Sequence, residues 1–144
     1  VCFGHQLVAR ALGGEVVKAD SGWGVGVQTT RLLEQRPWMT PVRDALPLLV
    51  THQDQVRRPP EGATVLAERD TCPYDMLQIS EHVLTFQGHP EFVPGYVGAL
   101  IERRRELIGE PTAQQGLASL SQPTAGDIAR GWIHNFLHKA AVER

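Results

Sequence analysis

Six short apolar stretches between residues 15 and 87 constrain the fold more than any other feature of the chain. They cover residues 15–19, 25–32, 46–52, 64–69, 75–79 and 82–87. Each has the length and the Val, Ile, Leu, Thr and Phe content typical of a β-strand. Turn formers separate them, among them Pro59-Pro60-Glu61-Gly62 and Thr71-Cys72-Pro73. The pattern predicts a sheet of several short strands.

Helical patterns flank these strands on both sides in the sequence. Leu7, Val8, Ala11 and Leu12 recur at helical spacing, and Gly13-Gly14 supplies the left-handed residue that ends such a helix. Later in the chain, two more helices are expected, one from about Pro94 to Gly109 and one beginning after Thr124. The stretch PTAQQGLASLSQPTAG between them is interpreted as a loop.

Composition and charge exclude several classes of protein. With 144 residues, of which 42% are hydrophobic and 21% charged, the chain has the composition of one soluble globular domain. Its formal net charge of −2 comes from basic and acidic residues spread along the chain, so no field favours a nucleic acid or an anionic membrane. The one basic run, Arg103 to Arg105, is interpreted as a solvated helix face.

The cysteine count and the absence of long apolar windows lead to further expectations. Cys2 and Cys72 are too few for a disulfide scaffold, and no spacing of His and Cys indicates a metal site. No window reaches the roughly 20 apolar residues of a membrane span, and no secretory leader is recognised. We therefore expect a cytoplasmic protein that binds neither nucleic acid nor membrane.

Cys2 lies immediately before the first predicted helix. A thiol at a helix N-terminus gains stabilisation of its anionic form, and the free backbone N–H groups there can bind an oxyanion. A tight turn at such a position needs small residues nearby, and Gly4 is one. The position is that of a candidate nucleophile.

A thiol nucleophile also needs a base, and the base needs a group that orients it. Gly88-His89-Pro90-Glu91 follows the apolar run that ends at Phe86, so His89 is expected at the end of a strand. There His89 can serve as the base, with the Glu91 carboxylate holding its tautomer.

Each motif alone has a plainer explanation. A single cysteine is more often a small buried hydrophobic residue, and a single His-Pro-Glu is more often a turn. Chance would give each pattern a frequency on the order of 1 in 10⁴ per position, because each fixes three residue types of a few per cent usage. The presence of both in one short chain, at element boundaries, favours chemistry.

At this point the sequence resembles a known family. CFGHQ at 2–6 and GHPE at 88–91 resemble the two catalytic signatures of the class I (triad) glutamine amidotransferases. SGWGVGV at 21–27, THQDQV at 51–56 and TFQGHPEF at 85–92 are similar to the GMP-synthase-like members. The resemblance covers residues 1 to about 110 and implies a flavodoxin-like, three-layer α/β fold.

The resemblance also implies roles for individual residues. Cys2 would attack the side-chain amide of glutamine to give a glutamyl thioester, His89 would act as general base and acid, and Glu91 would orient His89. The backbone N–H of Phe3 would be one oxyanion donor. Neither a metal nor an organic cofactor is expected.

The same resemblance predicts the substrate pocket. Gln6, His52, Gln53 and Asp54 would line a pocket for glutamine, partly through backbone groups. Such a pocket must pair an α-amino and an α-carboxylate group, a task that polar loop residues suit. Taken alone, His52 and Asp54 would be assigned to an exposed turn.

Departures from the family pattern lead to an expectation about the extent of the domain. The glycine and the glycine-rich loop expected before Val1 are not in the sequence, nor are the early strands of a doubly wound sheet. Residues 1–144 are therefore expected to be the C-terminal portion of a single amidotransferase domain with its N-terminal strands missing. Expressed alone, they are expected to be inactive and prone to aggregate. A stand-alone amidotransferase is expected, rather than one fused to a synthetase.

Two alternatives remain open for the function. A γ-glutamyl peptidase could be built on the same domain, with a pocket open on the leaving-group side. A non-catalytic fragment or regulatory homologue could keep the motif residues without forming the oxyanion hole. An ammonia-donating enzyme would need an acceptor synthetase as a partner, whereas the small-molecule substrate would be glutamine or a γ-glutamyl compound in either enzyme.

Overall fold

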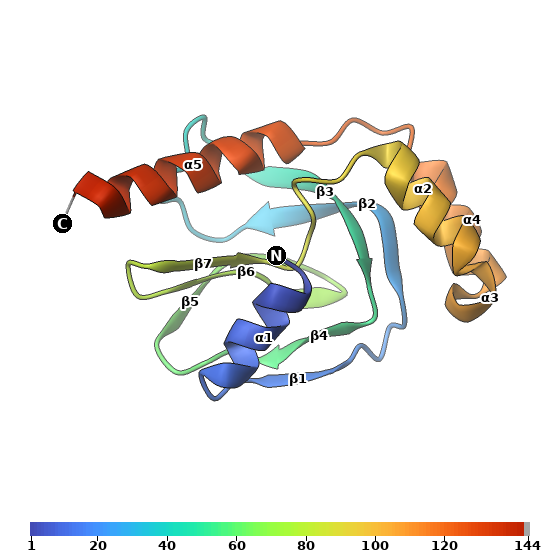
Figure 1. The fold of residues 1–144 in the computed structure, drawn as a ribbon, viewed down its shortest axis with the longest axis horizontal. Coiled ribbons are helices and arrows are strands. Elements are labelled where there is room, and N and C mark those ends of the chain that lie inside the picture. Colours follow the sequence, from blue (N-terminus) through green and yellow to red (C-terminus); the bar gives the residue numbers. More distant parts are fainter. Residues whose placement is uncertain (143–144) are drawn as a thin grey trace.

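Seven strands form two antiparallel sheets in the computed structural model, which describes residues 1–142 (Figure 1). The larger sheet has the order β3-β2-β5-β6-β7, and the smaller one pairs β1 with β4. The strands are β1 (Glu15–Lys18), β2 (Gly24–Leu32), β3 (Ala45–His52), β4 (Asp54–Arg58), β5 (Ala63–Arg69), β6 (Cys72–Ile79) and β7 (Val83–Phe86).

Five helices surround these strands in the described part of the chain. They are α1 (Phe3–Ala11), α2 (Pro94–Arg103), α3 (Arg105–Ile108), α4 (Glu110–Ser119) and α5 (Gly126–Val142). Figure 1 shows α5 lying along one side of the strands, with α2, α3 and α4 gathered at one end. None of the helices within residues 1–142 is both long and apolar enough to cross a bilayer.

Two apolar cores lie on opposite faces of the larger sheet. Because successive strand residues point to opposite faces, Leu46 and Leu48 of β3 pack toward α5, whereas Leu49 packs toward α2 and α4. Trp132 of α5 is fully buried in the first core, and Ile101 of α2 in the second. Helices therefore cover both faces, as expected for a three-layer fold.

The six predicted strands are confirmed, with ends that differ by up to three residues. The pattern did not predict β4, because Val56 is the only buried residue in its sequence DQVRR. Its pairing with β1, which places Val56 opposite Val16, supplies the stabilisation that the local sequence lacks.

The loop expected at 111–126 is wrong for its first part, because α4 occupies Glu110–Ser119. This helix buries the small residues Ala113 and Gly116, so its sequence has little apolar periodicity. Small residues are needed there, because a Cβ on Gly116 would lie 2.6 Å from a methyl group of Val25 in β2. The helix is stabilised by close contact with the sheet.

Two further boundaries differ from the prediction. The helix expected over 94–109 is interrupted at Arg104, whose φ of −108° and ψ of 14° separate α2 from α3. Cys72 and Pro73, expected in a turn, open β6, and Cys72 pairs with Arg69 across the hairpin. The turn is therefore one position earlier than the proline suggested.

Candidate active site

Cys2 has a backbone conformation that side-chain-bearing residues rarely adopt. Its φ is 46° and its ψ is −105°, and it occupies the N-cap position of α1. Its backbone N–H donates a 2.8 Å hydrogen bond to the carbonyl oxygen of Phe86, which holds the turn against the end of β7. A strained turn that presents a side chain at a helix N-terminus is the geometry of a nucleophile elbow.

Gly4, the small residue expected to make room at this turn, does not approach any neighbour within residues 1–142. A Cβ placed on Gly4 would meet no heavy atom within 4 Å. The positive φ of Cys2 is therefore maintained by backbone hydrogen bonds, including the bond to Phe86 and one of 2.9 Å from Gly4 N–H to Val1 oxygen.

The two thiols differ in their surroundings. Burial raises the pKa of Cys2 above its ordinary value, and the backbone N–H of Phe3 acts in the opposite direction. Cys72 is fully buried, and that burial raises its pKa to about 12. Because a thiol with a raised pKa is protonated at neutral pH, Cys2 would need a base to react.

His89 and Glu91 form the expected pair. The imidazole Nδ1 lies 2.7 Å from Glu91 Oε1, and since an ionised carboxylate only accepts hydrogen bonds, Nδ1 carries the proton. The backbone N–H of His89 donates to Leu49 oxygen at 2.8 Å, which attaches this segment to β3. The Nε2 lone pair is thus available to accept a proton.

An aromatic residue that sequence reasoning missed fixes the plane of this imidazole. Phe92 stacks on His89 with ring centroids 3.8 Å apart and an interplanar angle of 4°. Tyr96 of α2 contacts the same phenyl ring edge-on at 4.8 Å. The position of Phe92 directly after the His-Pro-Glu motif was the only available signal.

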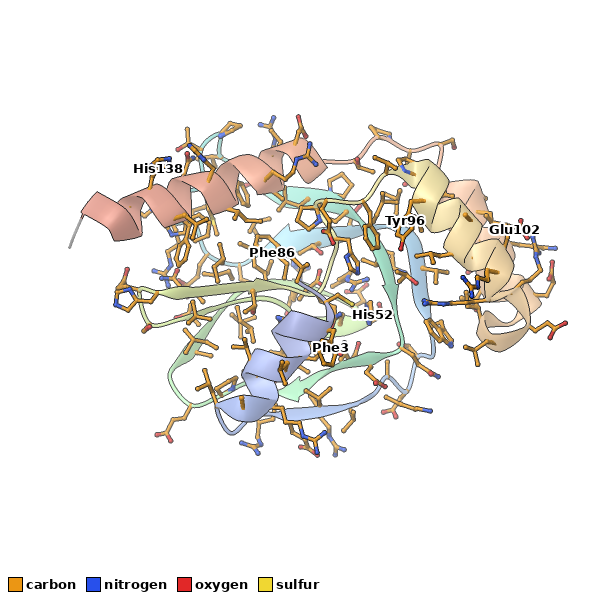
Figure 2. All side chains as sticks on the ribbon, in the orientation of Figure 1. Phe3, His52, Phe86, Tyr96, Glu102 and His138 are labelled. Carbon is orange, nitrogen blue, oxygen red and sulfur yellow. The ribbon has the colours of Figure 1, made fainter. Side chains whose placement is uncertain are left out.

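A pocket of about 470 Å³ brings together the predicted substrate residues. Its lining includes all six residues predicted at the elbow and in the substrate pocket, namely Cys2, Phe3, Gln6, His52, Gln53 and Asp54. Figure 2 shows the side chains of Phe3 and His52 near the N-terminal end of α1. His89 and Glu91 do not line the pocket, and the hydrogen bonds of His89 within residues 1–142 do not reach Cys2.

Four lining residues were missed by sequence reasoning. They are Lys18, Trp23, Thr51 and Arg104. Arg104 belongs to the basic run that was assigned to a solvated face; its side chain is exposed as expected, but it borders the pocket. Together with Lys18 it places two cations beside a cavity that also contains a thiol.

His52 is held by a buried polar network. Its Nδ1 lies 3.0 Å from Asp54 oxygen, and Arg69 donates to its Nε2 at 2.9 Å. Arg69 is in turn paired with the buried Asp75 at 3.0 Å and hydrogen-bonded to Gln28. Burial lowers the pKa of His52 to about 4, and the charge of Arg69 acts in the same direction. The imidazole is therefore neutral at physiological pH.

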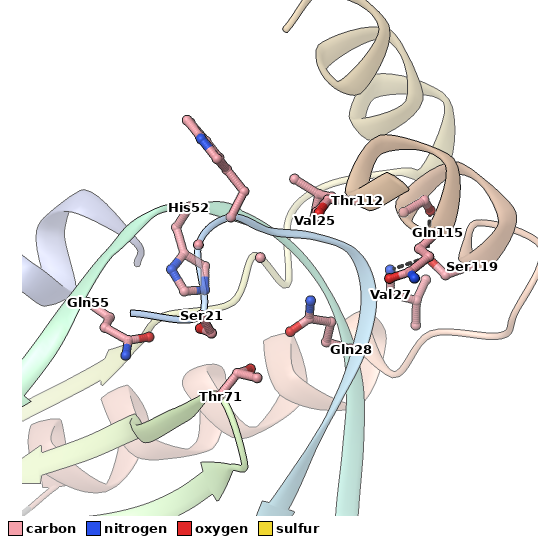
Figure 3. A pocket seen from close by; sticks show the side chains of 14 residues that line it. Ser21, Val25, Val27, Gln28, His52, Gln55, Thr71, Thr112, Gln115 and Ser119 are labelled. Carbon is pink, nitrogen blue, oxygen red and sulfur yellow. Dashed lines mark hydrogen bonds between the residues drawn. The ribbon is translucent and has the colours of Figure 1, made fainter. Parts of the chain in front are cut away.

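A second cavity of about 350 Å³ lies beyond His52 and shares both that residue and Trp23 with the first. Figure 3 shows Gln28, Gln55 and Thr71 around its space, with α4 forming another wall. The side chains that line it are uncharged at physiological pH, the neutral His52 included. It is a polar extension of the site rather than a hydrophobic pocket.

The chain belongs to the class I glutamine amidotransferase family, because the family profile "Glutamine amidotransferase class-I" matches residues 1–105. The resemblance drawn from CFGHQ and GHPE is thereby confirmed at the level of the family.

Curated relatives carry more than one kind of name. Gamma-glutamyl peptidase 2 of Arabidopsis thaliana is 32% identical over 111 residues, which are 74% of this chain and 44% of the relative. A glutamine-hydrolyzing GMP synthase subunit of Archaeoglobus fulgidus is 32% identical over 104 residues, with 72% and 56% covered. A glutamine amidotransferase-like protein of Schizosaccharomyces pombe is 30% identical over 139 residues, with 95% and 56% covered. The chain spans about half the length of these relatives.

Solved structures confirm the fold. A glutamine amidotransferase from Thermotoga maritima superposes with a TM-score of 0.71 at 17% identity, over 96% of this chain and 59% of that one. A glutamine amidotransferase from Methylobacillus flagellatus gives a TM-score of 0.72 at 21% identity, over 94% and 59%. The flavodoxin-like fold of class I amidotransferases, expected from the sequence, is the fold that these residues share.

Proposed function

We propose that this chain carries the catalytic residues of an enzyme that hydrolyses the side-chain amide of glutamine or of a γ-glutamyl compound. The observation that carries the proposal is the left-handed conformation of Cys2 at the start of α1, beside a polar pocket. Membership of the class I glutamine amidotransferase family supports it.

In the proposed first step, Cys2 Sγ attacks the amide carbon and His89 takes the thiol proton. The tetrahedral oxyanion is stabilised by the backbone N–H of Phe3, which lies at the N-terminus of α1. Collapse of the intermediate breaks the C–N bond, and His89 returns the proton to the departing nitrogen. Ammonia or an amine leaves, and a γ-glutamyl thioester remains on Cys2.

In the second step, water attacks the thioester while His89 accepts a proton from it. The C–S bond breaks, the proton returns to the sulfur, and glutamate leaves. Glu91 keeps the proton of the imidazole on Nδ1 throughout, so that Nε2 exchanges protons with the reacting groups. Within residues 1–142 no hydrogen bond joins His89 to Cys2, so the two side chains must move closer for the proton transfer. Catalytic contacts of this kind commonly tighten when the substrate binds.

The proposed substrate pocket suits an amino acid. The α-carboxylate would pair with the cations Lys18 and Arg104, while Gln6 and the segment 51–54 would contact the α-amino group and the chain. Gln6 is held for this role, since its Nε2 donates to Asp54 oxygen at 2.7 Å.

Glutamine and γ-glutamyl peptides are both candidate substrates, because a gamma-glutamyl peptidase and a glutamine-hydrolyzing GMP synthase subunit are both relatives of this chain. If glutamine is the substrate, the ammonia would pass to a partner synthetase. Release of glutamate should therefore be measured with glutamine and with a γ-glutamyl dipeptide in parallel. The preferred substrate is the one with the larger kcat/KM.

Cys2→Ser should abolish hydrolysis of the preferred substrate, because removal of one member of a catalytic unit lowers the rate by several powers of ten. Cys72→Ala is the matched control, since it alters the other, fully buried thiol. It should keep most of the activity of the folded protein. These measurements are made on the full-length protein, because residues 1–144 alone are expected to be inactive. There, hydrolysis that survives in Cys2→Ser, or no hydrolysis of either substrate, would contradict the proposal and favour a non-catalytic homologue.

A further inference from the structure

Gln87 is a fully buried polar residue between the end of β7 and the Gly88-His89 segment. Its backbone N–H donates to Asp75 oxygen at 2.8 Å, which fixes the residue against β6. A buried amide side chain is costly unless its donor and acceptor groups are used. The partners of this amide therefore indicate what it does.

Both ends of the Gln87 side chain point at the candidate site. Its Nε2 donates to Cys2 Sγ at 3.5 Å, and its Oε1 accepts from Gln6 Nε2 at 3.2 Å. Gln6 can only donate through that nitrogen, so the orientation of the Gln87 amide is settled by its partner. The N–H group, not the carbonyl, faces the sulfur.

We propose that Gln87 is a catalytic residue, whose amide N–H donates to the sulfur of Cys2 and stabilises the thiolate that forms when His89 removes the proton. The proposal rests on the function proposed above for Cys2. An amide is well suited to this task, because it donates a hydrogen bond to an anion without competing with His89 for the proton.

The groups around Cys2 influence its ionisation in both directions. Burial opposes ionisation of the thiol, and so does the negative charge of Glu91, which must be present to orient His89. The backbone N–H of Phe3 and the Gln87 amide favour it. Gln87 is the uncharged side chain among these favourable groups.

A chain of hydrogen bonds connects this donor to the substrate pocket. The Gln6 amide nitrogen that donates to Gln87 also donates to Asp54 oxygen, at 2.7 Å. Asp54 oxygen in turn lies 3.0 Å from His52 Nδ1. The position of the Gln87 amide is therefore set by the pocket wall, and substrate-lining residues orient the group that touches the nucleophile.

The test is the pH dependence of Cys2 alkylation by iodoacetamide, measured by peptide mass in a Cys72→Ala background. Gln87→Met keeps the length of the side chain and removes the donor. It should raise the pH at which Cys2 becomes reactive and slow alkylation at pH 7 about tenfold, as expected for loss of a hydrogen bond to a charged group. The limiting rate at high pH should be unchanged.

Gln78→Met is the matched control, because Gln78 is also buried but bonds to Ser80, just after β6. It should leave the alkylation profile unchanged. Gln87→Glu, which keeps the size and polarity of the residue, should slow alkylation at least as much as Gln87→Met and decides the question if Gln87→Met does not fold. A folded Gln87 variant whose profile superposes on that of the parent would overturn the proposal.

This experiment separates the two proposals, because alkylation needs no turnover. If the full-length protein hydrolyses neither glutamine nor a γ-glutamyl dipeptide, but its Cys2 reactivity depends on Gln87, the result would contradict the proposed function and support the contact between Gln87 and the thiolate. Hydrolysis that requires Cys2, with alkylation independent of Gln87, would overturn only the role of Gln87.

Discussion

The backbone N–H of Cys2 donates to the carbonyl oxygen of Phe86, the last residue of β7, over 2.8 Å. This bond joins the two sequence motifs, because the residues that follow Phe86 are Gln87, Gly88 and His89. The elbow and the segment that carries the candidate base are thus attached to the same strand end. The placement of Cys2 relative to His89 therefore depends on a backbone hydrogen bond, which does not require particular side chains.

Glu91 and His89 should differ in their effect on catalysis. His89→Ala should lower kcat by several powers of ten, because it removes the proposed proton carrier. Glu91→Gln should lower it about a hundredfold or less, since the carboxylate is 45% exposed and orients the ring without touching substrate. Steady-state rates decide the matter, and a larger loss in Glu91→Gln than in His89→Ala would reverse the assigned roles.

Arg104 should contribute to substrate binding rather than to the chemical step. Its exposed side chain borders the Cys2 pocket, so Arg104→Gln should raise KM with little change in kcat. The expected increase in KM is about fivefold, because an exposed ion pair contributes about 1 kcal/mol to binding. Arg103→Gln is the control, because the neighbouring Arg103 is also exposed but does not line the pocket. Equal values of KM in the two variants would remove Arg104 from the site.

Two buried histidines should make folding stability sensitive to acid. Burial lowers the pKa of His5 to about 4 and that of His52 to about 4, from an ordinary value of 6.5. As the pH falls below 6.5 the unfolded chain takes up a proton on each, while the folded protein resists until about pH 4. Stability that is complete above pH 6.5 should therefore be lost between pH 6.5 and 4, by about 3 kcal/mol for each histidine.

Denaturant unfolding across this pH range checks the prediction. A variant of either buried histidine that cannot titrate, such as His52→Asn, should show a weaker dependence of the unfolding free energy on pH than the parent. His82→Gln is the control, because it removes an exposed histidine and leaves both buried histidines in place. Identical pH profiles for His52→Asn and the parent would contradict the prediction, because they would show that folding does not lower the pKa of His52.

Exposed leucines of α1 and of its C-cap residue should cause residues 1–144 to self-associate. Leu7 and Leu12 are 53% and 51% exposed, and an apolar cavity of about 420 Å³ lies between α1, β7 and α5. Light scattering across a range of concentrations should show association that is reduced by Leu7→Lys and Leu12→Lys together. Leu107→Lys, at an exposed leucine of α3, should reduce it less; a monomer at every concentration would contradict the prediction.

Sequence reasoning succeeded where local chemistry determined the outcome. Strands such as β2 and β3 have runs of β-branched and apolar residues that are typical of strands, and Cys2 precedes a helix that begins where its pattern begins. By contrast, α4 buries Ala113 and Gly116, whose role depends on the approach of β2 and leaves no apolar period.

The parts of the site that sequence reasoning missed depend on contacts between distant segments. Lys18, Trp23 and Arg104 meet at the Cys2 pocket from separate parts of the chain. Arg69 and Asp75 lie on either side of a hairpin turn, and only the folded sheet brings them to His52. Gln87 stood within the quoted motif TFQGHPEF, but its contact with Cys2 requires the strand end to lie beside the elbow.

The most direct test of Cys2 as the nucleophile is the site at which a glutamine-derived electrophile, such as a diazo ketone analogue of glutamine, attaches to the protein. Cys2 borders a polar pocket. Cys72, in contrast, is fully buried, and this burial raises its pKa to about 12. Peptide mass mapping should find one adduct, on Cys2, whose formation slows when glutamine or a γ-glutamyl dipeptide is present. An adduct on Cys72, or equal and slow labelling of both thiols, would show that Cys2 is not the nucleophile.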